Sequence, residues 1–146
     1  MPERVIRQKA VCYIVQNGRL LVFCHLGQPW DASGLQVPAG SIRPGESPES
    51  AALREAAEET GLAALHVVRK LGEVRYDMAP YRPEIQHRHV FELGLHGDTP
   101  ERWVSRETDP DAGSERPVLQ CYWIPLAQGH VLSAGQGALL GLLGSG

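Results

Sequence analysis

Hydrophobic residues fill two short segments near the start of the chain, without the alternation of a half-exposed strand. Residues 9–15 read KAVCYIV, residues 19–25 read RLLVFCH, and Asn17-Gly18 lies between them. Continuous apolar segments of this length are typical of strands buried on both faces, and Asn-Gly favours the tight turn of a hairpin. The pattern therefore predicts a central hairpin with a further layer on each side.

Later segments extend this pattern. Residues 131–143 are predicted to form a terminal helix, although their glycines disfavour one. Strands around an internal helix, closed by this second helix, predict an α/β fold of α/β/α type, with one domain over residues 1–146. The additional strands are expected at residues 35–38, 66–76, 86–95 and 118–124.

Residues 47–61 carry the local signals of the internal helix. Ser47 is a favourable N-cap, Pro48 suits the first helical position, and Gly61 can take the left-handed conformation that ends a helix. Small and apolar residues at 51–53 and 56–57 allow one side to pack closely on a sheet. Just before the helix, the sequence RPGE places Pro and Gly at the central positions of a type II turn.

Three glutamates of this helix, Glu55, Glu58 and Glu59, have the i, i+3 and i+4 spacing that puts them on one face. Their mutual repulsion, and their place near the C-terminal end where the helix dipole disfavours anions, destabilise the helix unless a cation binds. The alternative is an ordinary solvated face on which Arg54 pairs with Glu58. The like-charged triplet, its position and the preceding Pro-Gly turn favour a divalent-cation site.

Residues 40–62 resemble the motif of Nudix hydrolases, G-x5-E-x7-R-E-U-x-E-E-x-G-U, in which U is a bulky aliphatic residue. Ala56 departs from the pattern, because it is smaller than the usual residue at the first U. This resemblance implies a mixed sheet between helices and cleavage of a phosphoanhydride bond. The matching positions are Gly40, Glu46, Arg54, Glu55, Glu58, Glu59, Gly61 and Leu62.

Phosphoanhydride hydrolysis needs charge neutralisation on the phosphates and an activated water, and Mg²⁺ or Mn²⁺ on oxygen ligands supplies both. We therefore expect Glu55, Glu58 and Glu59 to bind the metal, and the resemblance adds the backbone carbonyl of Gly40. Arg54 is expected to orient these carboxylates through charge-assisted bonds. Glu46 is expected to support the metal ligands from outside the coordination sphere.

The resemblance implies that the substrate is a nucleoside diphosphate linked to another group. Nucleotide sugars, dinucleoside polyphosphates, ADP-ribose and nucleoside triphosphates all fit this description. A Nudix-fold domain that binds nucleotides without turnover, or regulates another protein, is the alternative. The intact triplet with Arg54 favours the enzyme, because a binding module has no need to tolerate that repulsion.

The general base has two candidate sources, a glutamate of the motif or an acid from a later loop. Residues 97–117 form the longest segment without periodicity, and a loop of this length is usually functional or disordered. We select Glu115 because it lies just before the strand predicted at 118–124. The other acids in this segment are Glu101, Glu107, Asp109 and Asp111.

Substrate contacts are predicted from aromatic and basic residues outside the motif. Trp30, Tyr76 and Tyr81 can stack on a base, and Arg88 can contact phosphates, although such residues also serve as core anchors or solvated strand positions. His87 and His89 alternate along one strand and share a face that could hold a transition metal. The acidic motif itself prefers harder cations.

Composition and charge bear on the partners and the cellular location expected for this protein. The chain has 146 residues and a formal net charge of −3, so we expect a small-molecule partner and no nucleic-acid surface. Cys12, Cys24 and Cys121 are isolated in apolar segments and read as buried free thiols of a cytoplasmic protein. No apolar segment is long enough to span a membrane, and a homodimer remains open.

Overall fold

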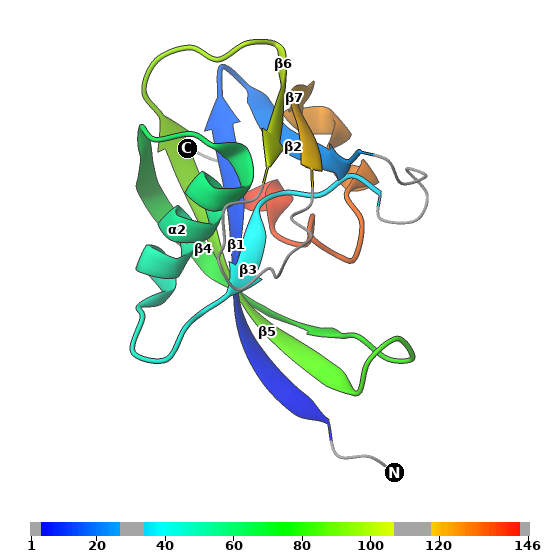
Figure 1. The fold of residues 1–146 in the computed structure, drawn as a ribbon. Helices are drawn as coiled ribbons and strands as arrows, with labels where there is room; N and C mark the ends of the chain where they lie inside the picture. The colour runs from blue at the N-terminus through cyan, green and yellow to red at the C-terminus, as the bar shows by residue number, and fades with distance from the viewer. Residues whose placement is uncertain (1–3, 27–33, 107–117, 144–146) are drawn as a thin grey trace.

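The computed structural model describes residues 4–26, 34–106 and 118–143. The first half contains β1 (Val5–Gln16), β2 (Arg19–His25), β3 (Ala39–Ser41) and the helix α2 (Pro48–Thr60). The second half contains β4 (Leu65–Asp77), β5 (Glu84–Leu95), β6 (Arg102–Arg106) and β7 (Val118–Pro125). Two 3₁₀ segments, Leu126–Val131 and Leu140–Leu142, follow (Figure 1).

The strands form one mixed sheet, which confirms the predicted α/β class. Its order is β4-β5-β1-β2-β7-β6, and β3 pairs with β1 off this path. Strands β1 and β5 run parallel, whereas the other pairs are antiparallel. The predicted hairpin is present, because β1 and β2 pair across Asn17 and Gly18, whose φ angles are 54° and 72°.

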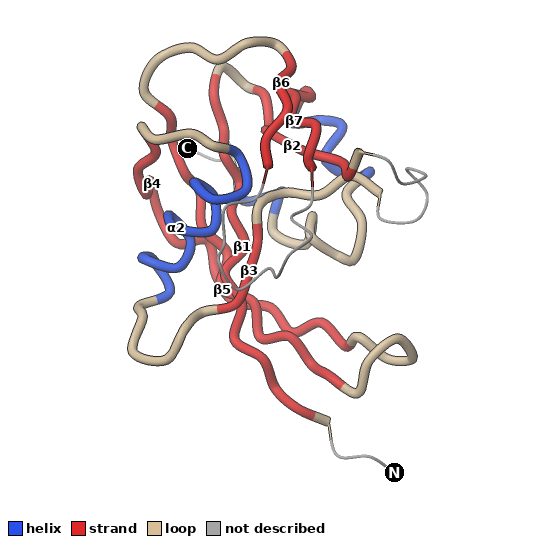
Figure 2. Tube along the Cα trace, in the orientation of Figure 1, coloured by secondary structure: helices blue, strands red, loops and turns tan. Residues whose placement is uncertain are grey.

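A core lies on each face of the sheet. Helix α2 packs against one side of the strands (Figure 2). Ala51, Ala52 and Ala56 of α2 are fully buried in the first core. Their small side chains bring the helix so close to β1 that the Cys12 thiol donates a 3.2 Å hydrogen bond to the Ala52 carbonyl. The small residue at position 56 thus fits a tight helix–sheet contact.

Leucines from the C-terminal segment cover the opposite face, but the predicted helix over residues 131–143 is wrong. This segment consists of turns and short 3₁₀ pieces. Ala134 and Gly135 have φ angles of 52° and 68°, and left-handed backbone interrupts an α-helix. Leu132, Leu139 and Leu140 still pack against the second core, so this layer is present without being helical.

Two other predicted segments differ from the structure. The strand expected at 35–38 is reduced to isolated bridges at Leu35 and Gln36, and the regular strand comes later, as β3. The Val37 amide bonds the side-chain oxygen of Gln136 at 2.8 Å, instead of a neighbouring strand. The segment 97–117, predicted as a loop, contains β6, which forms through antiparallel pairing with β7.

The three cysteines differ in their burial. Cys12 and Cys121 are buried free thiols, as predicted, whereas Cys24 is only half-buried. Burial raises the pKa of Cys121 to about 12. In the part of the chain that the structure describes, no helix is both long and apolar enough to cross a membrane.

Candidate active site

Helix α2 begins and ends where the sequence predicts. The Ser47 hydroxyl accepts the Ser50 amide at 3.1 Å, and Gly61, with φ 76°, donates its amide to the Ala57 carbonyl at 2.9 Å. In the turn before the helix, Gly45 has φ 77° and the Glu46 amide bonds the Arg43 carbonyl at 3.0 Å. This local geometry presents the charged face of α2 to β3.

Arg54 is the centre of a network of charged groups. Its Nε and Nη2 atoms contact the two carboxylate oxygens of Glu46 at 2.8 and 2.9 Å. Its Nη1 donates to Glu55 Oε1 at 2.9 Å and to Glu58 Oε2 at 3.3 Å, and Nη2 also donates to the Ser41 carbonyl at 2.9 Å. The guanidinium therefore fixes three carboxylates relative to one another.

Electrostatic interactions keep Glu46 and Arg54 charged. Hydrogen bonds from Arg54 hold the pKa of Glu46 at about 2, and the Arg43 amide, 3.0 Å from Glu46 Oε1, acts in the same direction. The pKa of Arg54 is raised, first by Glu46 and then by Glu55. Both partners are ionised throughout the neutral range.

Strand β3 brings backbone groups to the remaining carboxylates. The Ala39 amide donates to Glu59 Oε1 at 2.8 Å, and Glu59 is largely buried. The carboxylate of Glu55 lies directly against Gly40, where a Cβ atom would approach it to less than 3.0 Å. Gly40 therefore supplies the space that this carboxylate occupies.

The donor types of these residues suit a hard divalent cation, although their ligand atoms do not all lie within 4.8 Å of one another. Glu55, Glu58 and Glu59 offer carboxylate oxygens, and Gly40, which the Glu55 carboxylate contacts, offers a backbone carbonyl. Mg²⁺ and Mn²⁺ prefer oxygen donors of these kinds. Arg54 contacts Glu46 as well as Glu55 and Glu58, so one positive charge meets three negative ones. A divalent cation would offset the excess negative charge.

A cavity of about 210 Å³ adjoins this cluster, with Ala39 and Gly40 on its wall. The cavity lies on the opposite side of β1 from the first core and α2, because Val11 on the cavity wall belongs to the second core. Polar and charged side chains dominate the rest of the lining. They are Lys9, Gln36, Gln86, Arg88 and Gln136.

Arg88 is the buried cation of this cavity, and Tyr76 packs against it. The guanidinium carbon lies 4.4 Å from the centre of the Tyr76 ring. Its Nε donates to Gln86 at 3.0 Å and its Nη1 to the Ala134 carbonyl at 2.6 Å. Burial lowers the pKa of Arg88, and Tyr76 partly opposes this effect. Two of the predicted substrate residues are therefore brought together.

The other predicted residues lie elsewhere. Tyr81, on the connection between β4 and β5, is 87% exposed and is absent from the cavity wall. Trp30 and Glu115 lie outside the described residues, as do the acids at 107, 109 and 111. Glu101 is exposed and pairs with Arg19 at 3.2 Å.

Sequence reasoning missed the polar cavity residues Lys9, Gln36, Gln86 and Gln136. Lys9 bonds the Ser41 hydroxyl at 2.8 Å, and burial lowers its pKa despite the opposing effects of Glu84 and Glu55. Lys9 could have been recognised in the sequence, because it is the charged first residue of the otherwise apolar strand predicted at 9–15. Gln136 lies in the segment misread as a helix, so its approach to Val37 had no local signal.

Comparison with known proteins gives the family. Residues 6–138 match the model of the NUDIX domain. The chain belongs to the Nudix family. Solved structures agree on the fold: the MutT protein of Methanosarcina mazei Go1 aligns with a TM-score of 0.68 and 17% identity, covering 97% of this chain and 95% of that one. A UDP-X diphosphatase aligns with a TM-score of 0.66 and 18% identity, over 96% of this Nudix chain and 63% of that chain.

Curated relatives match over shorter stretches. An ADP-ribose pyrophosphatase of Bacillus subtilis (strain 168) is 32% identical over 80 residues, which is 53% of this chain and 41% of the relative. An RNA pyrophosphohydrolase of Brucella ovis is 31% identical over 104 residues, covering 63% of this chain and 55% of the relative. The Nudix chain thus spans only about half the length of these relatives.

Proposed function

We propose that this Nudix chain is a pyrophosphohydrolase that uses Mg²⁺ or Mn²⁺ to cleave a phosphoanhydride bond in a nucleoside diphosphate linked to another group. One observation carries the proposal. The carboxylate of Glu55 lies against Gly40, and Gly40 also lines the cavity that contains Lys9 and Arg88. An acidic cluster and a basic cavity therefore meet at a single glycine.

In this proposal Glu55, Glu58 and Glu59, with the Gly40 carbonyl, hold the metal. A bound Mg²⁺ or Mn²⁺ neutralises phosphate charge and lowers the pKa of water. Arg54 holds Glu55 and Glu58 in place, while Glu46 fixes Arg54 through both carboxylate oxygens. The Ala39 amide orients Glu59 in the same way.

The cavity would bind the part of the substrate beyond the reacting phosphates. Arg88 and Lys9 are cations that attract phosphate oxygens, and the ring of Tyr76 holds the Arg88 guanidinium in place. The glutamines at 36, 86 and 136 offer hydrogen bonds to a sugar or a base. Trp30 and Tyr81 stay predictions as stacking residues.

The general base stays a prediction. We retain Glu115, and Glu58 is the alternative, because Glu58 remains 16% exposed and so stays open to water. We also infer that residues 1–146 form one domain, an inference that the family match over residues 6–138 supports. A cytoplasmic location is proposed from the free thiols. We propose a small-molecule substrate and leave a homodimer open.

Hydrolysis of a substrate panel tests the proposed function. ADP-ribose and an RNA with a 5′-triphosphate are included because two curated relatives are named for ADP-ribose and RNA. A nucleotide sugar, a dinucleoside polyphosphate and nucleoside triphosphates complete the panel. We expect phosphate or nucleoside monophosphate release with Mg²⁺ or Mn²⁺, and none after chelation. Either cation should also raise the melting temperature, because it binds the native state. Nucleotide binding without turnover would instead support a silent domain.

Gly40→Ala is expected to lower turnover by about 10- to 100-fold while the protein stays folded. The added methyl group takes the space of the Glu55 carboxylate, and that flexible side chain can swing away without unfolding the sheet. Gly141→Ala is the matched control, because its Cβ would meet nothing within 4 Å. Equal turnover of the two variants would contradict the role of Gly40.

A further inference from the structure

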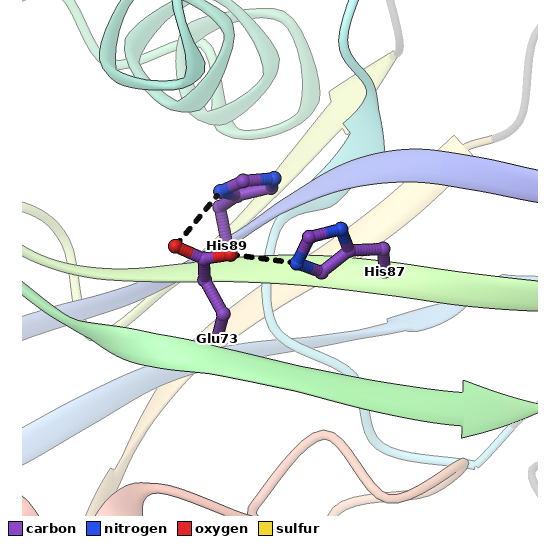
Figure 3. A group of neighbouring side chains, drawn as sticks. All are labelled: Glu73, His87 and His89. Carbon is purple, nitrogen blue, oxygen red and sulfur yellow. Dashed lines mark hydrogen bonds and ion pairs between the residues drawn. The ribbon is translucent and has the colours of Figure 1, made fainter.

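A second group of metal-binding side chains lies on β4 and β5, separate from the glutamates of α2. Glu73 of β4 is directly opposite His89 of β5, and His87 is two residues away on the same strand (Figure 3). The sequence indicated a shared face for the two histidines but no third ligand. The pairing of β4 with β5 supplies it.

The three side chains converge on one point. His87 Nε2 lies 2.7 Å from Glu73 Oε1, and His89 Nδ1 lies 3.9 Å from Glu73 Oε2. One ligand atom from each residue falls within 4.8 Å of the others. Because metal–nitrogen and metal–oxygen bonds of Zn²⁺ are about 2.0–2.2 Å long, small rotations of these side chains bring all three atoms onto one ion.

Hydrogen bonds determine which ring nitrogen of His89 carries the proton and which has the lone pair that can bind a metal. The Lys70 ammonium, 3.1 Å from Nδ1, can only donate, so Nδ1 is the acceptor. The proton therefore sits on Nε2, which donates to the side-chain oxygen of Gln8 at 2.9 Å. An outer partner of this kind orients a metal-binding histidine.

We propose that Glu73, His87 and His89 form a site for Zn²⁺ or a similar transition-metal ion that links β4 to β5, with Gln8 holding His89. Lys70 donates to both Glu73 and His89 in the metal-free protein, at 2.9 and 3.1 Å. Its side chain is 37% exposed and can move into solvent when the metal binds. Two imidazoles and one carboxylate select a softer ion than the all-oxygen cluster of α2.

Zn²⁺ titration by calorimetry, in excess Mg²⁺ to saturate the oxygen site, tests this proposal. We expect one strongly bound Zn²⁺ per chain. His87→Ala and Glu73→Gln should each weaken its affinity by about 10²-fold or more, and Gln8→Ala by about 10- to 100-fold. Lys70→Gln should tighten binding by about tenfold or more, because it removes a competing positive charge.

His66→Ala is the matched control. The rings of His66 and His96 lie 4.6 Å apart, as do those of His87 and His89, but within the described ranges only the latter pair joins a three-ligand group. Zn²⁺ affinity should be unchanged in this variant. His87 is half-buried, so its loss should leave the fold intact, as a melting scan without metal checks. Zn²⁺ should raise the melting temperature of the parent but not of His87→Ala.

The results separate a metal site from a plain ion-pair network. No Zn²⁺ binding in excess Mg²⁺, or equal affinities of His87→Ala and His66→Ala, would overturn the proposal. So would weaker binding by Lys70→Gln, since it would make Lys70 a supporting residue instead of a competitor. None of these outcomes depends on hydrolase activity, so the metal site stands or fails independently of the proposed function.

Discussion

Glu58→Gln and Glu59→Gln should each lower the catalytic rate by about 10²-fold or more at saturating Mg²⁺. Each substitution removes one negative charge from the proposed metal ligands, and a preorganised charge at the reacting centre has an effect of this size. The fold should survive, because a glutamine oxygen can still accept the Ala39 amide that now bonds Glu59 at 2.8 Å. Initial rates on the best panel substrate measure the effect.

Glu49→Gln provides the control for these variants. Glu49 is exposed in the first turn of the same helix, at the opposite end from the acidic cluster. Its substitution should leave the rate unchanged and lower stability by at most about 1 kcal/mol through the helix dipole. Parental rates for both Glu58→Gln and Glu59→Gln would contradict the proposed active site.

Arg54→Ala should lower the free energy of unfolding by about 3–5 kcal/mol in metal-free protein at pH 7. The substitution leaves Glu46, Glu55 and Glu58 without their shared guanidinium, and these side chains are only 6–16% exposed. Arg54→Lys should recover part of the loss, because one ammonium cannot reproduce the bidentate contact with Glu46. Chemical denaturation measures each value.

The pH dependence of this loss has a definite sign. Arg54 depresses the pKa of Glu46 from 4.5 to about 2 in the folded protein. A depressed carboxyl pKa stabilises the fold above its ordinary value, and this contribution disappears as the pH falls toward the folded value. The stability difference between parent and Arg54→Ala should therefore shrink as the pH decreases from about 4.5 to about 2.

Arg7→Ala is the control, because the Arg7 side chain is 60% exposed where it pairs with Glu84 at 3.5 Å. Its loss should change the unfolding free energy by at most about 1 kcal/mol. Arg54→Ala should exceed this value clearly. Equal losses for the two arginines would mean that the Arg54 network contributes no more than a surface ion pair.

The helix limits predicted from capping residues were confirmed, whereas the helix predicted at 131–143 from its apolar residues was wrong. The caps at Ser47 and Gly61 depend on residues no more than four positions away, so the limits of α2 were predictable. The segment 131–143 has apolar residues that suit a helix. Its left-handed backbone at Ala134 and Gly135 allows those leucines to pack on the second core as turns.

Strand pairing explains most of what sequence reasoning missed. Strand β6 was not predicted, because it lies in a polar segment and its formation depends on pairing with β7. Glu73 could not be matched with His89, because the register of β4 and β5 shifts between Lys70 and Gly72. An irregularity of this kind moves later residues of the strand to a different partner.

The acidic helix, the turn before it and the family to which the chain belongs were all predictable from the amino-acid sequence. All of these depend on the identity and spacing of residues within 40–62. The three-dimensional fold was needed to place the carboxylate of Glu55 against Gly40 and to bring Lys9 and Arg88 into one cavity beside it. The reason is physical: β1 pairs with both β3 and β5, and this register joins residues that are far apart in the chain.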